Sequence, residues 1–119
     1  MEKINLARKL SLFDEQWSPR IVGEVNDVQV KLAKLGGEFV WHRHEAEDEL
    51  FLVVTGRLTM RFRDREEVLE PGELIIVPHG VEHQPVADEG TAVLLVEPKT
   101  TLNTGNVRNE RTVEQLKRV

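Results

Sequence analysis

Short apolar runs, each bounded by turn-forming residues, recur along this sequence at spacings of roughly 8–12 residues, which is typical of all-β proteins. No helical segment separates the runs, so a parallel sheet built from β–α–β units is not indicated. The pattern instead predicts an antiparallel β-sandwich or barrel. The expected strands span residues 20–25, 28–35, 39–44, 49–55, 57–63, 68–69, 74–77, 81–86 and 92–96.

The two ends of the chain differ from this pattern. Apolar residues recur at helical spacing within residues 5–13 and predict a short helix there. Asn5, at the start of this stretch, is a suitable N-cap. A second short helix is expected over residues 111–118. The 119 residues are enough for one domain. We expect a single domain, 1–119, with an N-terminal arm (1–19), a barrel (20–98) and a C-terminal tail (99–119).

The composition excludes several classes of partner and chemistry. A formal net charge of −5 argues against nucleic acid and anionic membranes as partners. No apolar run approaches the roughly 18 residues of a membrane-spanning helix. The chain has no cysteine, so it can form no disulfide, thiolate ligand or thiol nucleophile. Together with an N-terminus that lacks an apolar signal core, this predicts a cytoplasmic protein.

The four histidines fall in two close pairs, and the first pair predicts a metal site. His42 and His44 are two residues apart, so in an extended strand their side chains would point to the same face. A turn through residues 45–48 would bring Glu49 back beside them on the next strand. Two imidazoles and one carboxylate are suitable ligands for a transition metal. A fourth ligand is expected from the second pair, His79 and His83.

The stretch around the first pair resembles the first signature motif of the cupin superfamily. That motif is a glycine, an H-x-H pair, a glutamate and a second glycine at set spacings. The matching residues here are Gly36, His42, His44, Glu49 and Gly56.

The second pair lies in a stretch that resembles the second cupin motif. Gly72, Pro78, Gly80 and His83 match it, and Ala87 stands where the family has asparagine. That asparagine is not a metal ligand in the family, so the change bears on how the strand end is held rather than on the metal. The motif selects His83 as the fourth ligand. His79 is expected to be a solvent-facing turn residue, with a place at the rim of the pocket as the alternative.

The resemblance implies a jelly-roll barrel, an antiparallel double-stranded β-helix, that holds a divalent transition metal. The implied ligands are His42, His44, Glu49 and His83. Nitrogen and oxygen ligands suit Fe, Mn, Zn, Ni or Cu, so the identity of the metal stays open. Because neutral imidazole is the form that binds metal, we expect binding to weaken as the pH falls below about 6.5.

Three carboxylates compete with Glu49 for the role of ligand. Glu45, Glu47 and Asp48 precede it directly. A turn of consecutive charges usually faces water, so we expect these three to form a solvated acidic turn. Glu49 is favoured because it opens the apolar strand and because the motif selects it.

The function implied by the resemblance is that of a small-molecule metalloenzyme. The chain looks most like small single-domain cupins labelled mannose-6-phosphate isomerase-like or polyketide-pathway proteins. An isomerase- or dioxygenase-like reaction on a sugar or an oxygenated organic substrate within the barrel is therefore expected, with catalytic residues still unknown. The alternative is a non-catalytic module that binds or senses a small molecule or a metal.

The two substrate classes would need different cavity walls. A sugar phosphate would need cations, and the candidates are Lys31, Arg57 and Arg61. For the two arginines, solvated outer faces are the competing interpretation. An oxygenase would need apolar walls, and the candidates are Phe39, Phe51 and Val53.

Three of the expected strands are apolar on both faces: 50–54, 74–77 and 92–96. A sheet exposed on one side should alternate between apolar and polar residues instead. The second face must therefore be covered by the N-terminal segment, a second sheet or another subunit. This observation predicts a homodimer, which is also common among proteins that resemble cupins.

Overall fold

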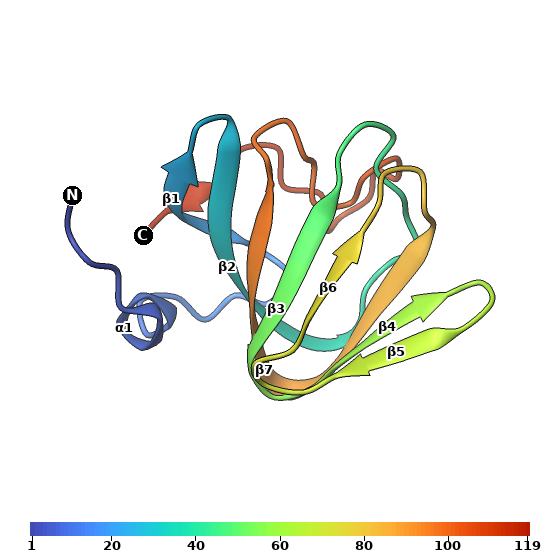
Figure 1. Ribbon diagram of the computed structural model, residues 1–119, viewed down its shortest axis with the longest axis horizontal. Helices are drawn as coiled ribbons and strands as arrows, with labels where there is room; N and C mark the ends of the chain where they lie inside the picture. Colours follow the sequence, from blue (N-terminus) through green and yellow to red (C-terminus); the bar gives the residue numbers. More distant parts are fainter.

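The computed structural model describes residues 1–119 and confirms the all-β jelly-roll prediction (Figure 1). One short helix precedes eight strands. Their bounds are α1 Leu6–Leu10, β1 Arg20–Val25, β2 Val28–Glu38, β3 Glu49–Thr55, β4 Leu58–Phe62, β5 Glu66–Leu69, β6 Leu74–Val77, β7 His83–Pro98 and β8 Lys117–Arg118.

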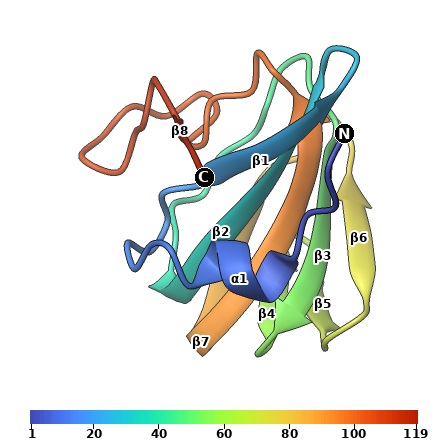
Figure 2. The same ribbon diagram turned by 90° about the vertical axis from the view of Figure 1, so that its left-hand side faces the viewer.

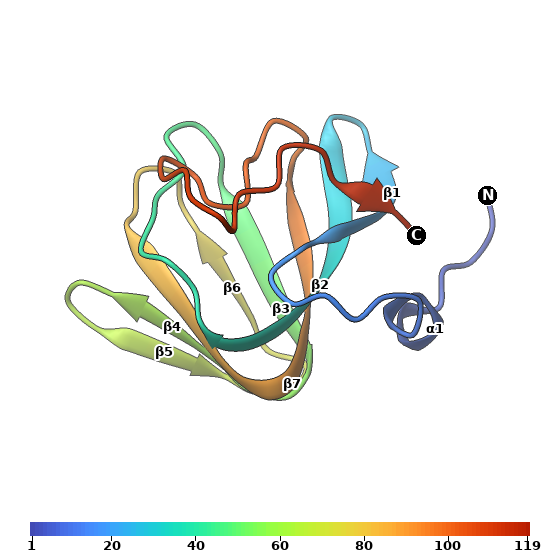
Figure 3. The ribbon, with the colours of Figure 1, turned by 180° about the vertical axis from the view of Figure 1, so that it is seen from behind.

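The barrel is organised around β7, which pairs antiparallel with β2, β3 and β4. The sheet order is β5-β4-β7-β2-β1-β8, and β3 joins β7 to β6. The last part of β7 lies between β2 and β3, and its first part pairs with β4. β7 therefore curves around the closed end of the barrel, as Figure 3 shows from behind.

The prediction of two strands, 81–86 and 92–96, is wrong because β7 runs without a break over 16 residues. The Asp88–Gly90 stretch, predicted as a turn, lies inside this strand. Gly90 has a φ of +83°, which bends the strand without ending it. A bulge or bend of this kind is how one long strand serves two sheets.

The segment before the first histidine pair also differs from the prediction. Gly36 and Gly37 were expected to turn the chain, but β2 continues through Glu38, with a register shift between Leu35 and Gly37. Residues 39–44 were expected to form a strand, and they form only one isolated bridge, between His42 and His83. We call this segment the crossing segment, because it connects β2 to β3 alongside the first part of β7, where the Phe39 amide donates to the Pro85 carbonyl (Figure 1).

Two groups of apolar side chains form the core. Eleven buried residues, among them Phe51, Met60 and Val93, fill the barrel. A smaller group lies outside it, where Leu10 and Phe13 pack against Leu32 and Ala92. In Figure 2, α1 lies across the outer face of the sheet beside β2. The N-terminal segment therefore covers part of the second apolar face.

The prediction for the N-terminal end of the chain is confirmed, and the prediction for the C-terminal end is wrong. The N-terminal helix forms, with Asn5 Oδ1 accepting a hydrogen bond of 3.0 Å from the Arg8 amide. The helix predicted over 111–118 is wrong, because its first residues form turns and β8 pairs parallel with β1. Side-chain oxygens compete for the backbone there: Asn109 Oδ1 accepts from the Arg111 amide and Asn103 Oδ1 from the Val113 amide.

No helix in the structure has the length and apolar character needed to cross a bilayer. The expected cytoplasmic location stays a prediction, as does the division into arm, barrel and tail.

Candidate metal centre

Four buried side chains meet near the open end of the barrel, and they are the four that the sequence singled out. His42 and His44 come from the crossing segment, Glu49 opens β3, and His83 opens β7. One ligand atom from each lies within 4.8 Å of the others, and no side chain of the four is exposed. We call this group the His/Glu cluster. Its composition and spacing fit a metal ion.

The backbone fixes two members of the cluster against each other. The amides and carbonyls of His42 and His83 exchange two hydrogen bonds, of 3.0 and 2.9 Å. The Nδ1 atom of each ring lies 2.9 Å from a backbone carbonyl two residues before it, of Val40 and Val81 respectively. A carbonyl can only accept, so both Nδ1 atoms donate, and in a neutral ring this leaves the Nε2 lone pair available to a metal. Such contacts orient a histidine that binds a metal.

Three polar atoms in the cluster are buried and have no hydrogen-bond partner: His44 Nε2, His83 Nε2 and Glu49 Oε1. The two nitrogens lie 3.2 and 3.4 Å from the same carboxylate oxygen without favourable hydrogen-bond geometry. Buried polar atoms without partners are costly and rare in native proteins. A cation placed among the three atoms would satisfy all of them, which is the structural reason that the cluster suits a metal.

Burial and neighbouring charges tune the ionisable groups of this centre. Burial, followed by the nearby His83 ring, lowers the pKa of His42 to about 4. Burial alone would raise the pKa of Glu49, but polar contacts with Glu97, His44 and His83 outweigh it and hold this pKa well below its usual range. Glu49 is therefore a carboxylate and His42 is neutral at pH 7. Proton competition at His42 begins well below the pH of about 6.5 expected for an ordinary histidine.

We expect the metal-free protein to lose stability through His42 as the pH falls from 6.5 toward 4. Over this range the unfolded chain protonates His42 and the folded chain does not, so the free energy of unfolding decreases, by about 3 kcal/mol in total. Urea denaturation with a chelator present, at several pH values, measures this loss. Glu97, whose raised pKa acts in the opposite direction, complicates the wild-type curve.

The test therefore compares variants. His42→Asn should show a shallower fall in stability between pH 6.5 and 4.5 than the wild type. His79→Asn, which changes an exposed histidine, should keep the wild-type slope. Equal slopes for the wild type and His42→Asn would contradict the assignment.

The C-terminal tail holds the crossing segment in place. Asn106 makes two backbone-directed contacts with Arg43, which lies between the two histidines: its Oδ1 accepts from the Arg43 amide, and its own amide donates to the Arg43 carbonyl. Gly105 lies so close that a Cβ atom there would overlap the Arg43 carbonyl and approach His42 Cδ2 to 3.0 Å. Tail and metal centre are therefore one packed unit.

Gly105→Ala is expected to destabilise the protein by about 2–4 kcal/mol, because it combines a positive φ with this overlap. Gly37→Ala is the matched control, since Gly37 also has a positive φ but no atom within 4 Å of the added Cβ. The control should cost only about 1–2 kcal/mol. Urea denaturation measures both, and equal losses would show that the contact with Arg43 has no weight.

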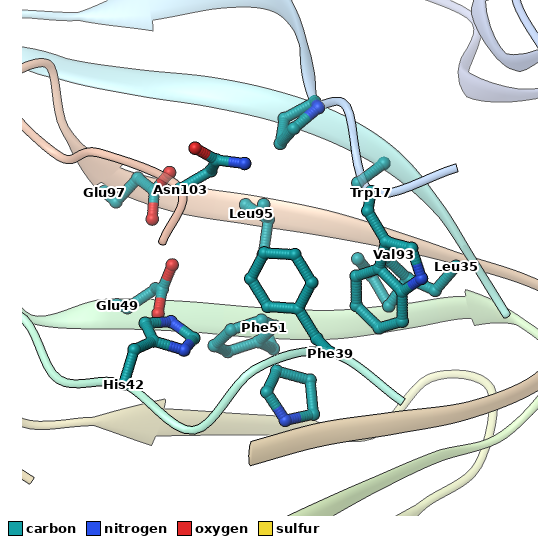
Figure 4. Close-up of a pocket in the computed structure, with 13 residues that line it drawn as sticks. Trp17, Leu35, Phe39, His42, Glu49, Phe51, Val93, Leu95, Glu97 and Asn103 are labelled. Atoms are coloured by element: carbon teal, nitrogen blue, oxygen red, sulfur yellow. The ribbon is translucent and has the colours of Figure 1, made fainter. Parts of the chain in front are cut away.

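A small cavity extends from the His/Glu cluster into the barrel (Figure 4). The space is about 420 Å³ when the open solvent at its mouth is counted, and the enclosed part has room for only a few water-sized groups. Its walls are mostly apolar, and Trp17 and Phe39 stack on one another at one side with ring centroids 4.7 Å apart. At the other end, Glu97 and Glu49 lie close together (Figure 4). The cavity therefore has one aromatic end and one polar end.

Some of the other residues predicted for the site line the cavity, and others do not. Phe39 and Phe51 line the cavity as predicted, whereas Val53 is buried in the core and is not part of the lining. Of the candidate phosphate ligands, Arg57 and Arg61 form surface ion pairs with Glu70 and with Glu38 and Glu66. Lys31 is buried and bound to Glu97.

The residues expected outside the site are found outside it. Glu45 pairs with Arg43 at the surface, and Glu47 Oε2 accepts a hydrogen bond from Thr100. Asp48 and His79 pair with each other at 2.8 Å, with both side chains 62% exposed. None of these four belongs to the His/Glu cluster.

Sequence reasoning missed Glu97, Trp17 and Asn103, and it named Lys31 only as a possible phosphate ligand. Strand parity contained a signal for Glu97, because Val93, Leu95 and Glu97 share one face of β7, and the first two are buried. Nothing local to Trp17 or Asn103 indicates that they reach the cavity, since both come from outside the barrel strands.

Comparison with known proteins agrees with this architecture. The family model described as Cupin domain (Cupin_2) matches residues 29–97. Over 79 residues the chain is 40% identical to the uncharacterized protein YdbB of Bacillus subtilis (strain 168), a match that covers 66% of this chain and 70% of that protein.

Two crystal structures share the fold over most of their length. A cupin-2 domain containing protein from Shewanella frigidimarina NCIMB 400 is 48% identical with a TM-score of 0.79, covering 81% of this chain and 94% of that one. Protein NMB1881 from Neisseria meningitidis is 32% identical with a TM-score of 0.74, covering 82% and 100%.

Proposed function

Because this chain belongs to the cupin family, we propose that it is a small-molecule metalloenzyme whose metal is held by His42, His44, Glu49 and His83. The observation that carries the proposal is the convergence of three buried, unpartnered donor atoms on one point. Neutral imidazoles and an ionised carboxylate are the forms that bind a divalent Fe, Mn, Zn, Ni or Cu ion. When bound, such an ion supplies Lewis acidity toward a substrate oxygen.

The chain's own residues would bind and shield the substrate. The apolar walls, among them Phe51 and Leu95, exclude water from the space beside the cluster. The backbone contacts of His42 and His83 keep their Nε2 atoms directed at one position, which reduces the reorganisation needed on binding. An oxygenated organic substrate suits these walls better than a sugar phosphate, because no unpaired cation lines the cavity.

The alternative function is a non-catalytic module that binds or senses a small molecule. Both functions predict bound metal, so metal content does not distinguish them. The test is whether the protein converts its ligand into a product. Small molecules that co-purify with the protein are released, identified by mass spectrometry and incubated with fresh metal-loaded protein. Conversion to a product supports the enzyme, and quantitative recovery of unchanged ligand supports the binding module.

We also propose a homodimer formed through the β6 patch, defined as Leu50, Leu52, Leu74, Ile76 and Leu94. Leu74 and Ile76 are 54% and 56% exposed, and their cross-strand partners on β3 extend the same apolar face. β6 pairs with β3 alone, so its other edge is free for a second copy. A stable interface of this kind buries roughly 1,000 Å² or more in total.

The double variant Leu74→Glu/Ile76→Glu is expected to convert the dimer into a monomer at micromolar concentration, because it places charges within an apolar interface. Leu12→Glu, at an exposed position near the N-terminal helix, is the control and should remain dimeric. Analytical ultracentrifugation measures both. If the wild type sediments only as a monomer, the proposed homodimer is wrong.

A further inference from the structure

The cavity beside the His/Glu cluster contains one polar atom that the metal centre does not explain. Among its lining residues, His42 and Glu49 belong to the cluster. Both polar atoms of the Asn103 side chain have a partner, since Nδ2 donates to the Arg111 carbonyl and Oδ1 accepts from the Val113 amide, both at 2.8 Å. Glu97 remains, and it is only 3% exposed.

The two carboxylate oxygens of Glu97 differ. Oε1 lies 2.6 Å from the Lys31 amino group, which is 1% exposed. Oε2 is buried and accepts no hydrogen bond from any donor of the chain, and the polar group that Glu97 contacts besides Lys31 is the Glu49 carboxylate. The carboxylate lies at the cavity end that Glu49 also reaches, across from the aromatic rings of Phe39 and Trp17 (Figure 4). Lys31 thus fixes the side chain so that one oxygen is left for a guest in the cavity.

We propose that Glu97 Oε2 and the aromatic wall form a subsite for the hydroxyl group of a small, mostly apolar alcohol or phenol. This inference rests on the proposed function, since it places such a ligand next to the metal. A hydroxyl group can both donate and accept a hydrogen bond. It therefore satisfies Oε2 whether the Glu97 carboxyl is ionised or protonated. The remaining carbon atoms of the ligand would contact Trp17, Phe39 and Phe51.

The same walls discriminate against a sugar phosphate. No Lys or Arg side chain lines the cavity to pair with a phosphate group, and the nearby amino group of Lys31 is already bound to Glu97. A polyhydroxylated ring would bury several hydroxyl groups against Phe, Leu and Val side chains, where they find no partners. The subsite therefore selects a ligand with few polar groups.

The test measures the binding of phenol and of fluorobenzene, which has nearly the same shape but no hydroxyl donor, to zinc-loaded protein by NMR titration. We expect phenol to bind the wild type at least about tenfold more tightly. In the double variant Lys31→Met/Glu97→Leu, which replaces both buried polar groups by apolar ones of similar size, this preference should fall to about threefold or less. Mannose 6-phosphate should bind neither protein measurably.

Phe39→Leu is the matched control, because it changes the wall and leaves Glu97 intact. It should weaken both probes and keep the preference for phenol. The inference is overturned if the wild type shows no preference, if the double variant keeps it, or if mannose 6-phosphate binds more tightly than phenol.

Zinc content, measured on the same samples, separates this inference from the proposed function. If zinc is bound and the preference does not depend on Glu97, the subsite is wrong and the metal centre stands. If the preference depends on Glu97 but the protein binds neither zinc nor, after equal loading, Fe, Mn, Ni or Cu, the subsite stands and the metalloenzyme proposal fails.

Discussion

His42→Ala and His83→Ala are each expected to lose most of the metal that the wild type binds. Each substitution removes one of four ligands and opens a space in a buried site whose other donors cannot move to fill it. Losing a supporting contact around a metal already costs roughly 10–100-fold in affinity, and the loss of a ligand should exceed that. The measurement is metal content per chain by elemental analysis, after equal loading and gel filtration.

Two matched pairs of variants make this result specific. His79→Ala removes an exposed histidine outside the cluster and should retain full occupancy. Glu49→Gln keeps the side-chain shape but removes the charge of a proposed ligand, so it should weaken binding more than Glu45→Gln at the surface. Full occupancy in His83→Ala, or metal loss in Glu45→Gln but not in Glu49→Gln, would show that the metal is bound elsewhere.

Glu97→Leu is expected to lower the free energy of unfolding by about 3–5 kcal/mol. The substitution leaves the Lys31 amino group buried without its partner, since both side chains are at most 3% exposed and bind each other at 2.6 Å. Lys31→Met/Glu97→Leu removes both groups and should recover most of the loss, because an apolar pair of similar volume carries no desolvation cost. Urea denaturation of metal-free protein measures both variants.

An exposed ion pair provides the control for this experiment. Arg65 and Glu67 bind each other with about half of each side chain in solvent. Glu67→Ala should therefore change stability by no more than about 1 kcal/mol. If the double variant were as unstable as Glu97→Leu alone, the loss would come from packing at position 97 and the unpaired amino group would not explain it.

The buried pair of Lys31 and Glu97 accounts for the polar character of this part of the barrel. Stability alone would favour apolar residues at positions 31 and 97, as in the remainder of the core. Retaining a lysine to hold a glutamate against the cavity makes sense where the glutamate contacts a guest. The structural cost and the proposed subsite are therefore two consequences of one arrangement.

Strands that end at turn residues could be predicted from local sequence alone. Strands β1, β3 and β6 have the predicted bounds, because Asn26, Gly56 and Pro78 stop the pattern locally. The four cluster residues were also identified before the structure, since the spacing of His42, His44 and Glu49 along the chain is a local property. The strand geometry assumed for His42 and His44 was wrong, and they come together because the backbone of His42 pairs with that of His83.

The continuity of β7 and the partners of the buried charges depend on long-range contacts and could not be predicted from local sequence. A local Asp-Glu-Gly sequence reads as a turn, and it stays within a strand here because residues on both sides of it pair with β2. Lys31 and Glu97 are 66 positions apart, and an isolated lysine in an alternating strand gives no sign of facing inward. Which of two strand faces is buried depends on the neighbouring strands and on the tail, and these long-range contacts are not written in any local pattern.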